Sequence, residues 1–118
     1  MAKYLVLIYG NEQIWTDQPP AWQKANAARH AALIASAGPA VLGVDELEPT
    51  ARAVSIRRGP KGKASVTDGP FQETKEIVGG YYLLEAPDLD EAIRLASQIP
   101  EATDSHGGVE IRPIVGNA

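Results

Sequence analysis

Asp68 and His106 are the two side chains whose types and settings best suit proton transfer. Asp68 follows a run of strand-favouring residues and precedes Gly69-Pro70, so its carboxylate lies in a turn. His106 lies in a polar, glycine-rich loop, and imidazole is the group best suited to exchange protons near neutral pH. We predict that they approach within hydrogen-bond or one-water reach as a catalytic pair, within or across subunits. The competing interpretations are an aspartate that only caps its turn and a histidine that is only an exposed loop residue.

Five further side chains are candidates for binding a substrate: Glu73, Lys75, Glu76, Tyr81 and Arg112. The first three crowd the loop after Asp68, where mixed charges either tune a carboxylate or form solvated surface pairs. Tyr81 and the adjacent Tyr82 lie in an apolar run and either line a pocket or belong to the core. Arg112 alternates with apolar neighbours, and it either binds an anionic ligand or forms an ion pair with Glu73 or Glu76.

The composition argues against several other chemistries. The chain has no cysteine, which removes disulfides, thiolate metal sites and thiol nucleophiles. Its two histidines are far apart in the sequence, and no His-x-x-x-His pair is present, so no ligand spacing for a metal is found. We therefore expect neither a metal nor another cofactor.

Length and charge narrow the class of protein. With 118 residues and 44% apolar content, the chain is expected to form one domain over residues 1–118. A formal net charge of −4 and a pI of about 5.1 oppose phosphate binding, so no nucleic-acid partner is expected. The apolar runs are too short for a bilayer, and the first run ends too early for a signal peptide. We expect a cytoplasmic protein with no membrane association.

Hydrophobic patterning predicts six strands and two helices. The strands are residues 3–9, 40–44, 51–58, 64–67, 77–86 and 109–114, and the helices are residues 21–37 and a segment from Asp88 to before Pro100. Segments 51–58 and 64–67 form a hairpin. A stripe of alanines in the first helix is expected to approach the sheet, at Ala21, Ala25, Ala28, Ala32 and Ala35. Gly79-Gly80 predicts a bulge or a close backbone approach.

This order of elements predicts an α+β fold of the ferredoxin-like split βαβ type with one inserted β-hairpin. Right-handed crossovers place both helices on one face of the sheet. Leu5, Leu7 and Tyr9 would then make the opposite face apolar as well, and such a face needs a cover. A second copy of the same face is the simplest cover, so we expect a homodimer that forms an α+β barrel.

Residues 67–76, which contain Asp68-Gly69-Pro70-Phe71, continue into Gly79-Gly80-Tyr81-Tyr82. Together with residues 4–10, 88–92 and 108–113, they resemble the DGPF-domain family of the YciI-like, or YCII-related, superfamily over essentially the whole chain. The resemblance implies a dimeric ferredoxin-like barrel and a proposed catalytic pair of a histidine and an aspartate. YciI-like proteins are thought to draw this histidine from the first helix region, so His30 is a second candidate beside His106. The alternative for His30 is an ordinary helix-surface or interface residue.

The resemblance supports two classes of function. One YciI-like protein removes chloride from a chlorinated hydroxyquinol, which implies a small-molecule enzyme of lyase or isomerase type acting on a small polar ring or acid. Many DGPF proteins are encoded beside extracytoplasmic-function sigma factors, which implies instead a ligand-sensing or regulatory partner of a sigma factor. A third hypothesis, RNA binding, rests on Gly80-Tyr81-Tyr82-Leu83, and the acidic pI opposes it. Function depends on the site, so the fold cannot decide between them.

Overall fold

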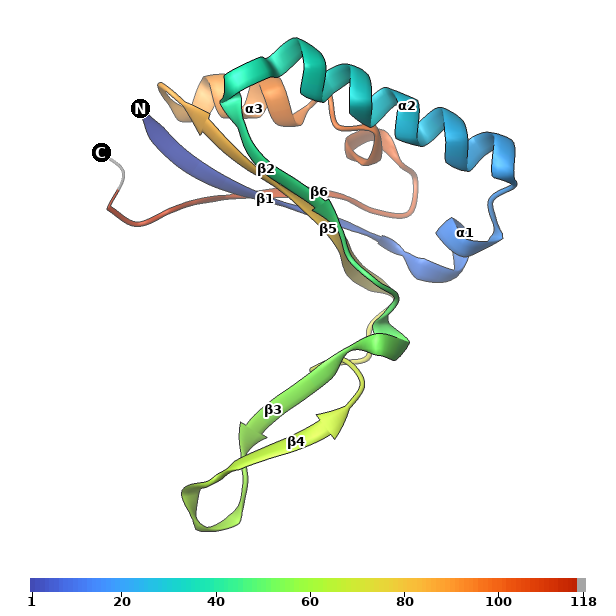
Figure 1. Cartoon of the computed structure of the whole chain (residues 1–118), viewed down its shortest axis with the longest axis vertical. Helices are drawn as coiled ribbons and strands as arrows, with labels where there is room; N and C mark the ends of the chain where they lie inside the picture. The colour runs from blue at the N-terminus through green and yellow to red at the C-terminus, as the bar shows by residue number, and fades with distance from the viewer. Residues whose placement is uncertain (117–118) are drawn as a thin grey trace.

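The computed structural model describes residues 1–116 and has the expected α+β architecture (Figure 1). Its main sheet has the order β2-β5-β1-β6, and all its hydrogen-bonded neighbours are antiparallel. The strands are β1 (Ala2–Asn11), β2 (Val41–Glu46), β5 (Glu76–Ala86) and β6 (Gly108–Pro113). Because the two most apolar strands are central, the prediction for β1 and β5 is confirmed. The arrangement is consistent with a ferredoxin-like fold.

Two helices, α2 (Pro20–Ala37) and α3 (Leu89–Ala96), cover one face of this sheet (Figure 1). The N-terminus of α3 is capped by Asp88, whose carboxylate accepts a hydrogen bond from the backbone N–H of Glu91 at 2.9 Å. Four short 3-10 turns complete the connections: Gly38–Ala40, Thr50–Arg52, Pro60–Gly62 and Pro100–Thr103. Within residues 1–116, no helix combines the length and apolar character needed to cross a bilayer.

The core lies between the sheet and the helices. Every second residue of β1, and of β5 from Gly80 onward, points to this side and is buried, so Val6 and Tyr82 are 0% exposed. The intervening residues point to the other side, which we call the helix-free face. The strand register places Leu5, Leu7, Tyr9, Tyr81 and Leu83 there, all of them partly exposed. The predicted apolar character of both faces of β1 is therefore confirmed.

The alanine stripe of α2 lies on the opposite side from the one predicted, because all five alanines are exposed. The side that faces the sheet carries Leu33 and Trp22, as expected, but with the polar Asn26 and His30 in place of the alanines. Alanine buries little surface and suits either side of a helix, so its spacing is a weak guide to orientation. The inward polar side chains are accommodated because a cavity separates this part of α2 from the sheet.

A short helix, α1 (Glu12–Asp17), was not predicted. The side chain of Asn11 caps it by accepting a hydrogen bond from the backbone N–H of Ile14 at 3.1 Å. The helix has only six residues and no apolar periodicity, so the pattern gave no signal. It places Trp15 over the end of the main sheet, where the cavity lies.

The predicted hairpin is confirmed as a separate two-stranded sheet of β3 (Val54–Arg58) and β4 (Ala64–Asp68). It is inserted between the edge strand β2 and its central neighbour β5. Figure 1 shows it projecting from the end of these strands, away from the layer of helices.

Candidate functional site

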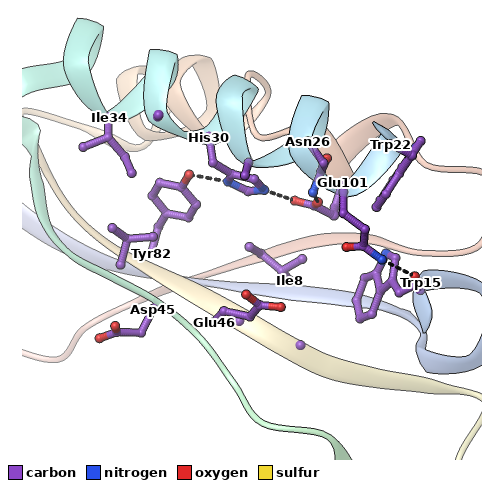
Figure 2. Close-up of a pocket in the computed structure, with 16 residues that line it drawn as sticks. Ile8, Trp15, Trp22, Asn26, His30, Ile34, Asp45, Glu46, Tyr82 and Glu101 are labelled. Carbon is purple, nitrogen blue, oxygen red and sulfur yellow. Dashed lines mark hydrogen bonds and ion pairs between the residues drawn. The ribbon is translucent and has the colours of Figure 1, made fainter. Parts of the chain in front are cut away.

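A cavity of about 460 Å³ lies between the N-terminal half of α2 and the sheet (Figure 2). This volume is within the range of pockets that hold small molecules. Apolar and aromatic side chains form most of the wall, and polar groups come from both the helix and the strands. The lining residues are Ile8, Trp15, Trp22, Gln23, Asn26, Ala27, His30, Ala31, Ile34, Val44, Asp45, Glu46, Gly79, Gly80, Tyr82 and Glu101.

Four polar side chains in this wall form one connected chain. Nδ1 of His30 lies 2.6 Å from the hydroxyl of Tyr82, and Nε2 of the same ring lies 2.7 Å from Oε1 of Glu101 (Figure 2). The other carboxylate oxygen of Glu101 accepts a hydrogen bond from Nδ2 of Asn26 at 2.9 Å. The chain therefore runs from Asn26 through Glu101 and His30 to the phenol of Tyr82.

Three elements distant in sequence bring these groups together. Asn26 and His30 are one helical turn apart on the inner side of α2. Tyr82 is in the central strand β5, and Glu101 is in the 3-10 turn that follows α3. Only 4% of Glu101 is exposed, so this carboxylate is held in the protein by its partners rather than by water.

Burial and hydrogen bonding act in opposite directions on Glu101. Burial by itself raises the pKa of the carboxyl group, but the hydrogen bonds from His30 and Asn26 and the charge of His30 outweigh it, so the net pKa is lowered. Tyr82 behaves differently, because burial, reinforced by the charge of Glu101, raises its pKa to about 12. At neutral pH the pair is therefore an ionised carboxylate and a protonated phenol.

These protonation states orient the imidazole of His30. One tautomer of the ring fits both contacts, with Nε2 donating toward the carboxylate of Glu101 and Nδ1 accepting from the phenol of Tyr82. If Nδ1 takes the phenol proton, the resulting imidazolium is stabilised by the adjacent carboxylate. The arrangement follows the logic of a nucleophile, a histidine and a carboxylate in hydrolase triads, with a phenol in the first position.

Two glycines leave room for the indole ring of Trp15, which forms part of the cavity wall. A Cβ atom added to Gly10 or Gly79 would overlap the indole ring of Trp15. The register of β1 and β5 also shifts at this point, since Ile8 pairs with Gly80 and Tyr9 pairs with Val78. The predicted bulge and close approach at the paired glycines are thus both confirmed. Within residues 1–116, the indole N–H of Trp15 has no hydrogen-bond acceptor.

Substitution of Gly79 by alanine is expected to displace Trp15 and lower the free energy of unfolding by about 1–2 kcal/mol, the cost of overpacking. In a Trp22→Phe background, the fluorescence of Trp15 is expected to shift to longer wavelength as the ring moves into water. Gly43→Ala is the matched control, because its new Cβ would meet only the Cβ of Leu83, at 3.9 Å. Equal spectra and stabilities for the two variants would contradict this account of the wall.

His106 contacts Trp15 but does not itself line the cavity. Its Nδ1 accepts a hydrogen bond from the backbone N–H of Asn11 at 3.0 Å, and its Nε2 is 3.7 Å from Asp104. The ring meets Trp15 edge-on, with 5.8 Å between ring centroids. In a single chain His106 thus ties the loop before β6 to the start of α1 and supports Trp15.

Asp68, Glu73, Lys75 and Glu76 also lie outside the cavity. Asp68 ends β4 on the projecting hairpin, the next two follow in the connecting loop, and Glu76 begins β5, all with exposed side chains. The cavity therefore takes its titratable groups from residues other than the predicted pair. The meeting of Asp68 with His106 across two subunits stays a prediction.

Tyr81 and Arg112 lie on the helix-free face, opposite to the cavity. The hydroxyl of Tyr81 donates a hydrogen bond to Oδ2 of Asp45 at 3.1 Å, and this bond together with the charge of Asp45 raises the pKa of the phenol. Arg112 is paired with Glu110, at 3.7 Å, rather than with Glu73 or Glu76. Both residues point toward the surface where a second copy is expected.

Sequence patterns indicate only two of the four connected polar side chains. Tyr82 was considered beside Tyr81, and His30 was a second candidate, but Asn26 and Glu101 were not considered. The available signal was the pair Asn26 and His30 at a spacing of four residues within an alanine-rich helix, which places two polar side chains on one side. No local feature marks Glu101, because its burial arises from packing against α2.

Among the described residues 1–116, no group of three His, Cys, Asp or Glu side chains forms a candidate metal site. Comparison with known proteins identifies the family. Residues 2–116 match the model of the YCII-related domain. An uncharacterised protein of Rhizobium meliloti (strain 1021), R00369, is 34% identical over 116 residues, which cover 94% of this chain and 90% of that protein. The chain therefore belongs to the YCII-related family.

Proposed function

We propose that this protein is a small-molecule enzyme that performs acid–base chemistry with Tyr82, His30 and Glu101. The single observation that carries the proposal is the unbroken chain of short contacts from a buried carboxylate to a phenol in the wall of a cavity. Perturbed titratable groups in a concave pocket are typical of catalytic sites. The cavity encloses the substrate, and the connected side chains of Glu101, His30 and Tyr82 provide a route for one proton.

Tyr82 lines the cavity and is the group that exchanges the proton with the substrate, which requires a local shift of the cavity wall because the residue is 0% exposed. A pKa of about 12 keeps the free phenol protonated, so it is a donor in the resting enzyme. When a bound substrate takes this proton, the phenolate recovers one from the product or from solvent, because Nδ1 of the resting His30 carries no proton. In the reverse direction, Nδ1 withdraws the phenol proton, and the phenolate oxygen removes a proton from the substrate. Glu101 keeps the imidazole oriented and stabilises its protonated form.

The lining indicates the class of substrate. Trp15 and Trp22 provide flat aromatic surfaces, and Ile8, Ile34 and Val44 complete an apolar wall. None of the lining residues is lysine or arginine, whereas Glu46 and Glu101 contribute carboxylates. A neutral or cationic polar ring fits this cavity better than the anionic acid considered from the sequence. Elimination and isomerisation suit the site, since both need only proton transfer.

We further propose that the active form is a homodimer. Leu5, Leu7 and Leu83 on the helix-free face form an apolar surface that one chain leaves uncovered. Apolar side chains that stay partly exposed together on one face of a sheet are typical of interaction surfaces. Pairing two such faces about a two-fold axis would cover both at once and produce the dimeric α+β barrel.

Elimination of HCl from a chlorinated hydroxyquinol is a suitable first assay, because the reaction releases one proton and one chloride ion and requires no electron acceptor. If the proposal holds, the parent releases chloride, and Tyr82→Phe lowers kcat about 10²–10⁴-fold, the usual contribution of a general acid or base. His30→Gln is expected to have a similar effect. Tyr9→Phe is the matched control, because it removes a phenol hydroxyl from the helix-free face.

Equal rates for Tyr82→Phe and Tyr9→Phe would reject Tyr82 as the proton carrier. Measuring ligand binding beside turnover distinguishes the enzymatic hypothesis from the ligand-sensing hypothesis. If thermal shift shows that the parent binds this probe without releasing chloride or forming another product, the ligand-sensing hypothesis replaces the enzymatic one.

A further inference from the structure

The β3–β4 hairpin carries a charge opposite to that of the rest of the chain. Residues 50–67, which we call the arm, contain five of the eleven basic residues and none of the fifteen acidic ones: Arg52, Arg57, Arg58, Lys61 and Lys63. The remainder has six basic and fifteen acidic residues, a formal net charge of −9. An arm with a charge of +5 is therefore attached to a strongly acidic body.

One side of the arm is covered by its own chain, and the other is not. On the covered side, the hydroxyl of Ser55 donates to the carbonyl of Gly69 at 2.7 Å, and the guanidinium of Arg57 lies 3.5 Å from the ring centroid of Phe71. On the other side, Ile56 faces Val66 across the hairpin, and they are 60% and 62% exposed. Val54, on the same side, is 58% exposed.

A two-stranded hairpin with three exposed β-branched side chains needs a cover. Isolated hairpins are at best marginally stable in water, and exposed apolar strands with free edges favour association. The side chains on the covered side show that the loop after β4 folds back on the polar surface only. The uncovered apolar side therefore remains for another molecule.

We infer that the arm packs on a second copy of this chain, with Val54, Ile56 and Val66 in the contact and the basic tip, Lys61 and Lys63, near the acidic body of that copy. The inference rests on the proposed dimer and adds a second contact to it. Figure 1 shows the arm projecting away from the helices, toward the side of the sheet that a second copy would occupy. Two-fold symmetry would make the exchange mutual, so each body would receive one arm.

Charge favours a second copy of this chain, rather than a polyanion, as the partner of the arm. Opposite net charges on the arm and the body attract when two copies meet, and salt weakens this attraction. The same acidic body would repel a nucleic acid or an anionic membrane approaching the arm.

Limited digestion with trypsin tests the inference, because Arg57, Arg58, Lys61 and Lys63 provide cleavage sites within the arm. Sedimentation velocity on the same samples reports whether the dimer is present. The comparison sample is a monomer produced by Leu7→Arg on the helix-free face. Cleavage of the arm is expected to be at least about tenfold slower in the dimeric parent than in the monomer, since docking lowers the population open to protease. Added NaCl should reduce this protection.

Two arm variants identify the contacts. Ile56→Ser/Val66→Ser is expected to raise the dimer Kd and abolish protection, whereas Ser65→Thr on the opposite side of the hairpin should change neither. Lys61→Glu/Lys63→Glu alters only the tip, so it leaves the strand pairing intact. It should raise the dimer Kd several-fold at low salt, with a smaller effect at high salt.

The possible results distinguish an error in the proposed arm contact from an error in the proposed dimer. A dimeric parent whose arm is cleaved as fast as in the monomer overturns the arm contact and leaves the sheet-to-sheet dimer standing. A parent that sediments as a monomer at every concentration overturns both. Protection that appears only when double-stranded DNA or phosphatidylserine vesicles are added overturns the second copy as the occupant.

Discussion

Glu101→Gln is expected to lower the free energy of unfolding by about 3 kcal/mol at pH 7, the cost of breaking a buried, charge-assisted pair. The carboxylate is 4% exposed and lies within hydrogen-bonding distance of both His30 and Asn26. Glutamine keeps the shape but removes the charge, and its amide cannot accept from both partners. Urea unfolding monitored by circular dichroism measures the difference.

The loss of stability in Glu101→Gln should be largest near neutral pH and should disappear in acid. The pKa of Glu101 is lower in the folded protein than its ordinary value of 4.5, so the ionised group stabilises the fold above about pH 4.5. This contribution disappears as the pH falls through the folded pKa, and the parent and Glu101→Gln should then converge. Glu48→Gln is the control, since an exposed side chain should change stability by less than about 0.5 kcal/mol. A stability difference that stays constant from pH 7 to acid would contradict the assignment of an ionised Glu101.

Leu7→Arg is expected to raise the dimer Kd at least about 100-fold, because each subunit would have to bury a guanidinium in an apolar interface at a cost of several kcal/mol. Leu7 lies in the central strand β1 and pairs with Tyr81 on one side and Glu110 on the other. Sedimentation velocity over a range of concentrations would show the parent as a dimer and the variant as a monomer. The monomer should keep its secondary structure, since the core between sheet and helices is untouched.

Ile93→Arg is the matched control for this prediction. Ile93 is 45% exposed on α3, which covers the opposite face of the sheet. The same change of residue there should leave the dimer intact. If both variants dissociate equally, or if neither does, the helix-free face is not the dimer interface.

Local sequence patterns predict the order and pairing of most elements. Continuous apolar runs need cover on both sides, and this requirement placed β1 and β5 in the centre of the sheet. Turn residues located the inserted hairpin, and the capping residue Asp88 located the start of α3. These features depend on local backbone preferences and periodic burial, and both are visible in the pattern of residue types along one sequence.

Local patterns did not identify the cavity. The alanine spacing in α2 suggested the wrong inward side, since alanine is nearly indifferent to burial while the true inward side carries Asn26 and His30. The six-residue helix α1 had too few turns to produce a period, so the position of Trp15 was not expected. Asp68 and His106 were chosen by residue type and loop setting, which do not record where a loop packs.

Which polar groups meet depends on long-range packing. His30, Tyr82 and Glu101 come from a helix, a central strand and a turn far apart along the chain, and their contacts of 2.6 and 2.7 Å follow from how α2 packs on the sheet. The low pKa of Glu101 and the high pKa of Tyr82 arise from that packing, because burial and neighbouring charges are properties of position in space. The amino-acid order thus determined the strands and helices, whereas long-range packing created the chemistry between them.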